Sequence, residues 1–122
     1  MANVAYYPRI YDLAHRFFEE AWEDMCDVSY PTMINEMRIG FPVVEITSKF
    51  HNPLRYGDII QAKIWVSKVG TKSITWQYEF RNQNDILLWS STQVTVCVSM
   101  DNMESLPIPD SLLPGLRNSK EE

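Results

Sequence analysis

The sequence has few of the residues that bind metals or form disulfides. Its 122 residues include two cysteines and two histidines, and neither a CxxC nor an HxxxH pair occurs. Zinc sites need closely spaced Cys, His or carboxylate ligands, so no metal site is expected. Cys26 and Cys97 lie far apart in a sequence without a recognisable signal peptide, which indicates reduced thiols in a cytoplasmic protein.

Long apolar runs and an excess of positive charge are also lacking. No run approaches the ~20 apolar residues that a membrane-spanning helix needs, and the N-terminus shows no targeting segment. Lys and Arg total 11 against 16 Asp and Glu, a formal net charge of −5, which argues against a general nucleic-acid or anionic-membrane surface. A hydrophobic content of 45% with 12% aromatics predicts one folded domain over residues 1–122.

The segment from Tyr6 to Met25 has the clearest helical pattern in the chain. Its apolar residues recur at i, i+3, i+4 and i+7, which predicts a helix with one broad apolar face. Pro8 suits the first helical turn, where a missing N–H costs nothing. The apolar face consists of Ile10, Leu13, Ala14, Phe17, Phe18, Ala21, Trp22 and Met25. Such a face has to be covered, and the segments downstream are the candidates.

Four later segments alternate between two faces, as β-strands do. They span residues 43–50, 59–69, 74–81 and 88–100, and connections rich in Gly, Asn, Asp and Pro separate them. One or two helical turns are expected at 32–38, and the tail from about 103 to 122 is expected to be irregular. On the last strand one face is formed by Leu88, Ser90, Thr92, Val94, Val96, Val98 and Met100. One long helix followed by four strands predicts an α+β domain, with an antiparallel sheet wrapped on a single helix.

Four sequence pieces occur in a recognisable order. They are YYPRIYDLAHRFFEEAW at 6–22, GFPVV at 40–44, the F-x-x-P-x-R-Y-G-D pattern at 50–58 and KVGTKSI at 68–74, which an aromatic strand follows. In this order the chain resembles the 4-hydroxybenzoyl-CoA thioesterase family from about residue 3 to residue 100. The resemblance implies a hot-dog fold, in which an antiparallel sheet curls around one long central helix. It also implies hydrolysis of acyl-CoA thioesters in pockets at a dimer interface.

The catalytic segment of that family has the pattern D-x-x-G-x-x-Y-Y/F-P. Tyr7 matches its second aromatic residue, Asn3 stands at the glycine position, and the aspartate would fall one place before Met1. The family's first strand, expected beside residues 59–69, would precede that aspartate. Either the natural protein starts upstream, which is the preferred interpretation, or this is a short form without the aspartate. The 122-residue form is then expected to hydrolyse thioesters at a near-background rate.

The resemblance also implies roles for residues of the helix. The backbone N–H of Tyr7, at the positive end of the helix, would stabilise the oxyanion, with Tyr6 and Tyr11 beside the substrate. His15 matches a polar position of the family's pocket, so it is expected to contact the acyl group or to act as a general base. In the alternative interpretation, His15 is a surface residue paired with Glu19 at i+4.

The phosphates of CoA require cations. Lys72 and Ser73 lie where the family places basic residues around the nucleotide, and Lys68 precedes them by four residues. The family's neighbouring arginines are replaced here by Gly70-Thr71 and by residues 104–106, which predicts weaker phosphate binding. Lys72 could equally be an ordinary lysine of a hairpin turn. No cofactor is expected, because the CoA thioester is the substrate.

The leading interpretation is an acyl- or aroyl-CoA thioesterase that forms a homodimer or homotetramer. By the resemblance, the strand at 43–50 would pair across the dimer, and no nucleic-acid or membrane partner is expected. The alternative is a non-catalytic hot-dog module that binds an acyl or aromatic ligand or serves as a scaffold.

Overall fold

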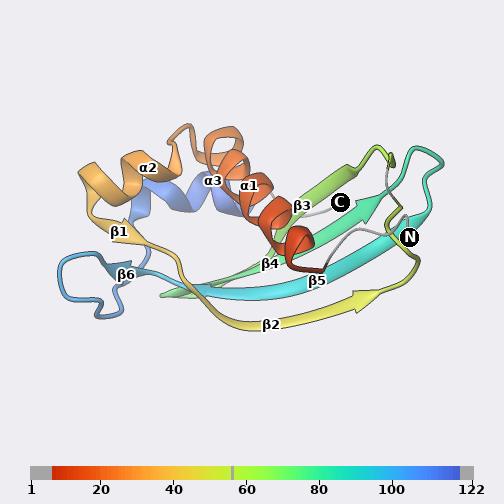
Figure 1. Cartoon of the computed structure of the whole chain (residues 1–122). Helices are drawn as coiled ribbons and strands as arrows, with labels where there is room; N and C mark the ends of the chain where they lie inside the picture. Colours follow the sequence, from red (N-terminus) through yellow and green to blue (C-terminus); the bar gives the residue numbers. More distant parts are fainter. Residues whose placement is uncertain (1–6, 56, 119–122) are drawn as a thin grey trace.

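The chain places one long helix on an antiparallel sheet (Figure 1). The structure, a computed structural model, describes residues 7–55 and 57–118. The fold class expected from the sequence, an α+β hot-dog fold, is confirmed. In chain order the elements are α1 (Tyr7–Cys26), α2 (Tyr30–Thr32), the π-helical η1 (Met33–Met37), β1 (Ile39–Gly40), β2 (Val43–Phe50), β3 (Gln61–Val69), β4 (Ser73–Arg81), β5 (Leu87–Val96), β6 (Val98–Ser99), the 3-10 turn η2 (Asp110–Leu112) and α3 (Leu113–Asn118).

Helix α1 buries the face that its periodicity predicts. Ile10, Ala14, Phe18 and Trp22, spaced four residues apart, are at most 5% exposed. The remaining predicted members of the face, Leu13, Phe17, Ala21 and Met25, are partly buried against the same core. The row of four lies over the aromatic residues of β4, and the ring centroids of Phe18 and Trp76 are 5.0 Å apart. Aromatic packing therefore fixes how α1 lies on the sheet.

The main sheet has the strand order β2-β5-β4-β3, with every neighbouring pair antiparallel. Within the described residues, β2 and β3 are the edge strands. Strand β2 is the more exposed edge, since Val44 is 62% exposed and Val43 and Ile46 are about half exposed. An exposed apolar edge of this kind is a surface on which another chain can pair.

The helix-facing side of β4 agrees with the sequence pattern, whereas that of β5 does not. Ile74, Trp76, Tyr78 and Phe80 are buried, as their alternation predicts. On β5 the side that faces α1 is instead formed by Trp89, Ser91, Gln93 and Thr95, and the buried Cys97 follows directly after the strand. A register shift near the start of β5, where Arg81 pairs with Leu87 but Phe80 pairs with Trp89, leaves Leu88 as an extra residue. Leu88 and Trp89 are both buried as a result, and three polar side chains enter the core.

The chain after Met103 is more regular than expected. Ile108, Leu112 and Leu116 are buried, and η2 and α3 form around them. Helix α3 packs against the C-terminal end of α1, where the thiol of Cys26 donates to the carbonyl oxygen of Leu112 at 3.7 Å. A short additional ladder, β1 with β6, forms from segments that the sequence pattern did not predict as paired strands.

Candidate active site

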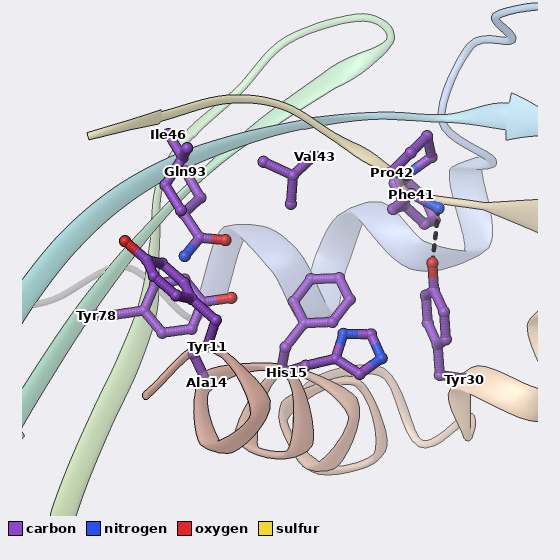
Figure 2. A pocket seen from close by; sticks show the side chains of 11 residues that line it. Tyr11, Ala14, His15, Tyr30, Phe41, Pro42, Val43, Ile46, Tyr78 and Gln93 are labelled. Atoms are coloured by element: carbon purple, nitrogen blue, oxygen red, sulfur yellow. Dashed lines mark hydrogen bonds between the residues drawn. The ribbon is translucent and has the colours of Figure 1, made fainter. Parts of the chain in front are cut away.

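A cavity of about 290 Å³ lies between α1 and the inner side of the β2 edge (Figure 2). Its size is at the lower end of the range for small-molecule sites. Its walls come from α1, from the start of β2 and from the centre of the sheet. The lining residues are Tyr11, Ala14, His15, Phe18, Tyr30, Phe41, Pro42, Val43, Ile46, Tyr78 and Gln93. Most of this surface is apolar, and a few polar groups point into it, which is the usual composition of a ligand pocket.

His15 lies at the rim of this pocket and is also a surface residue. Its side chain is 61% exposed, and its Nε2 is 2.9 Å from Oε2 of Glu19, the i+4 pair foreseen as the alternative interpretation. The ring stacks on Phe18 at 6.0 Å and meets Tyr30 edge-on at 6.5 Å. The two interpretations of His15 are therefore compatible, because Glu19 holds one ring nitrogen while the ring itself lines the pocket.

Tyr30 forms the other end of the pocket in Figure 2. Its hydroxyl oxygen accepts a hydrogen bond from the backbone N–H of Phe41 at 2.9 Å. Burial raises the pKa of Tyr30, although the bond from Phe41 acts in the opposite direction. The hydroxyl therefore stays protonated and fastens the α2 segment to the start of β2. The sequence analysis did not identify Tyr30 as a residue of the site.

The site residues predicted on α1 lie at different positions along the helix axis. Helix α1 begins at Tyr7, whose backbone N–H thus belongs to the first turn, while Tyr6 lies outside the described residues. Tyr11 lines the pocket and donates its hydroxyl to Oγ of Ser48 at 3.2 Å. Eight residues separate Tyr7 from His15, about 12 Å along a helix that rises 1.5 Å per residue. One carbonyl group cannot lie within hydrogen-bond distance of both the Tyr7 N–H and the His15 ring.

The residues expected to bind the CoA nucleotide do not line the pocket. Lys68 is near the end of β3, Lys72 is in the turn that leads into β4, and Ser73 is the first residue of β4. The Nζ atom of Lys72 donates to Oγ of Ser105 at 3.4 Å. These cations lie near the surface of the β3–β4 hairpin, so only an extended part of a ligand could reach them from the pocket of this chain.

Other kinds of site find little support in residues 7–55 and 57–118. In this part of the chain no three His, Cys, Asp or Glu side chains gather into a possible metal site. None of the described helices is long and apolar enough to cross a membrane. Both cysteines are free thiols, and burial raises the pKa of each, which keeps them protonated and unreactive.

Fold and pocket together define the class of protein. A sequence model of the Thioesterase-like superfamily matches residues 1–116. The chain therefore belongs to this superfamily.

Two of the similar proteins are enzymes that act on 1,4-dihydroxy-2-naphthoyl-CoA, an aromatic CoA thioester. A 1,4-dihydroxy-2-naphthoyl-CoA hydrolase of Thermosynechococcus vestitus is 25% identical over 122 residues, covering 99% of this chain and 82% of the relative. A thioesterase-superfamily structure from Jannaschia sp. superposes with a TM-score of 0.90 at 20% identity, over 98% of this chain and 83% of the other. A 1,4-dihydroxy-2-naphthoyl-CoA thioesterase from Synechocystis superposes with a TM-score of 0.83 at 17% identity, over 95% and 85%. At these identities the solved structures establish the fold.

Proposed function

We propose that this protein is an acyl- or aroyl-CoA thioesterase that holds the acyl group in the pocket beside α1, with turnover near background for any form of the chain that lacks the family's aspartate. The observation that carries the proposal is the mainly apolar cavity of about 290 Å³ along the N-terminal half of α1, in a member of the Thioesterase-like superfamily. The names of the relatives from Thermosynechococcus vestitus and Synechocystis support an aromatic acyl group.

The N-terminus of α1 is the proposed site of carbonyl polarisation. Hydrolysis adds the oxygen of water to the thioester carbonyl carbon and then breaks the C–S bond, and the CoA sulfur leaves with a proton. Negative charge develops on the carbonyl oxygen, and the N–H groups of a helix N-terminus stabilise such charge. We assign the Tyr7 N–H to this role. Because His15 lies about 12 Å further along the axis, we assign His15 to contact with the acyl group.

The first test measures hydrolysis with a pocket-filling variant. Purified protein is incubated with benzoyl-, hydroxybenzoyl-, naphthoyl- and straight-chain acyl-CoA, and released CoA is quantified by liquid chromatography. Ala14→Leu adds atoms to the pocket wall, so kcat/KM for aroyl substrates is expected to fall about tenfold or more. Ala21→Leu, on the same helix but outside this pocket, is the matched control. Binding of these thioesters without turnover would instead support the non-catalytic binding module.

The CoA nucleotide is proposed to extend from the pocket toward cations of a β3–β4 hairpin. Lys68, Lys72 and Ser73 remain the candidates for that contact. Because they do not line the pocket of the same chain, they would act on a ligand that leaves the pocket or on one held by a second copy.

A dimer through β2 is the proposed assembly. Val43 and Ile46 line the pocket yet are 48% and 45% exposed, so a second copy on this edge would both pair the strand and enclose the pocket. Light scattering at micromolar concentration is expected to give twice the mass of the chain. Val44→Asp places a charge on this edge and should yield monomer, whereas Ile86→Asp, at a similarly exposed site in the β4–β5 loop, should not. A monomeric wild-type protein would contradict the assembly.

A further inference from the structure

Two polar side chains in the pocket wall are almost fully buried. Tyr78 on β4 is 3% exposed and Gln93 on β5 is 6% exposed. Figure 2 shows both pointing into the cavity on the side of Tyr11, whereas Tyr30 and Phe41 bound the opposite side. Their polar ends face the cavity, so a ligand that fills it must either form hydrogen bonds with them or leave them unpaired, which is costly.

The Tyr78 hydroxyl is available as a donor. Among the described residues it has no hydrogen-bond partner, and its ring is held edge-on against Trp89 at 6.0 Å between centroids. Burial raises the pKa of Tyr78 far above its ordinary value, so the hydroxyl keeps its proton throughout the physiological pH range. A fixed ring with a protonated hydroxyl directs one O–H bond into the cavity.

The Gln93 amide is oriented by a chain of hydroxyl groups. The Ser91 hydroxyl donates its single proton to the carbonyl oxygen of Thr47 at 3.1 Å. It must therefore act as an acceptor toward the Gln93 amide, which donates through Nε2 at 3.3 Å, and toward Oγ of Ser48 at 3.0 Å. The Ser48 oxygen in turn accepts from Tyr11. This chain turns Oε1 of Gln93, an acceptor without a partner in the described part of the protein, toward the cavity.

A donor beside an acceptor suits a ligand group that both accepts and donates a hydrogen bond, and a hydroxyl group is the simplest such group. A hydroxyl group can accept from Tyr78 and donate to Gln93 at the same time, whereas an ether or nitro oxygen only accepts. A ligand without a polar substituent would leave both protein groups unsatisfied. A carboxylate would bring negative charge toward Oε1 of Gln93, and none of the lining residues that the structure describes is Lys or Arg.

We propose that Tyr78 and Gln93 form a recognition pair for a hydroxyl group on the acyl part of the substrate, which makes the protein selective for hydroxylated aroyl thioesters. This inference rests on the proposed thioesterase function and specifies its substrate class. Selectivity arises because an aroyl group without a hydroxyl substituent displaces water from Tyr78 and Gln93 but forms no hydrogen bond with either side chain. Ser91 acts as a positioning residue, since it sets the orientation of the Gln93 amide.

The test compares pairs of substrates that differ by one hydroxyl group. For 2-, 3- and 4-hydroxybenzoyl-CoA and for benzoyl-CoA, kcat/KM is measured in the wild type, Tyr78→Phe and Gln93→Met. Each variant keeps the volume of the side chain and removes the polar contact. The preference for the best hydroxylated substrate over benzoyl-CoA is expected to fall about tenfold in each variant. Thr92→Val removes a hydroxyl group from the outer face of β5, next to Gln93, and should leave the preference unchanged.

The outcomes separate this inference from the proposed function. If the wild type cleaves none of the thioesters, the proposed function fails, and titration calorimetry with the same uncleaved thioesters then gives the hydroxylated-to-parent affinity ratio. That ratio should again fall about tenfold in Tyr78→Phe and Gln93→Met. A wild type without preference for any hydroxylated substrate, or a preference that survives both variants, would overturn the recognition pair. Melting curves of the variants exclude misfolding as the cause.

Discussion

Replacing Gly115 with alanine is expected to lower the free energy of unfolding by about 1–3 kcal/mol. A Cβ atom at this position would clash with the carbonyl oxygen of Met25 and would lie 2.9 Å from Sγ of Cys26. The first of these neighbours is backbone at the end of α1, which cannot rotate away. Helix α3 would have to move off α1, and the buried side chains of Leu112 and Leu116 would move with it.

The control for this prediction lies on the same helix. Arg117 is exposed, so Arg117→Ala should change the free energy of unfolding by no more than about 0.5 kcal/mol. Urea denaturation of wild type, Gly115→Ala and Arg117→Ala at one fixed protein concentration makes the comparison, because an oligomer gains stability with concentration. Equal stability of all three proteins would show that α3 does not pack on α1 in solution.

The sequence predicted the elements whose own periodicity is strong. Helix α1 was expected over Tyr6–Met25 and spans Tyr7–Cys26. Alternation also located the four strands of the main sheet, although the last one, expected over 88–100, ends at Val96, and Val98–Ser99 pair with β1 instead. Both patterns are local, since each residue's face follows from its neighbours three, four or two positions away. Helix α3 escaped prediction because its six residues include Pro114 and Gly115. Its stability comes from the contact with α1, which no local pattern encodes.

The buried face of β5 shows a second feature that the sequence pattern could not predict. Alternation separates the two faces of the strand at 88–100 but does not say which of them is buried. The register shift at Leu88 and the large Trp89 turned the other side toward α1. Gln93 and Ser91 were consequently missed as residues of the site. The sequence did contain an indication that this row is buried, because Trp89 and Cys97 alternate with the same period as Ser91 and Gln93.

The candidate site could be predicted only where it lies on α1. Tyr11 and His15 were expected near the substrate and do line the pocket, because a helix fixes their relative positions. Tyr30, Phe41, Tyr78 and Gln93 reach the same pocket from four other segments. Which of these residues meet depends on strand order and register, which are long-range properties of the fold.

Replacing His15 with alanine is expected to raise KM for aroyl-CoA about tenfold while kcat changes by less than a factor of about three. The reason is geometric. At about 12 Å from the Tyr7 N–H along α1, the ring can touch the acyl group but not the water that attacks a carbonyl at the helix N-terminus. Its side chain is 61% exposed and its loss opens no cavity in the core, so the melting temperature should stay nearly constant.

The division of the effect between kcat and KM distinguishes contact from general-base catalysis. Loss of a general base would lower kcat by ~10²–10⁴ and would mean that the thioester carbonyl lies beside His15, two turns from Tyr7. Glu19→Gln tests the ion pair, because the amide can still accept from Nε2 and should preserve KM, whereas Glu19→Ala frees the ring and should raise KM in the same direction as His15→Ala. Asp12→Ala, an exposed site on α1 outside the pocket, is the matched control. Unchanged kcat and KM in His15→Ala would remove His15 from the site and leave it as a surface partner of Glu19.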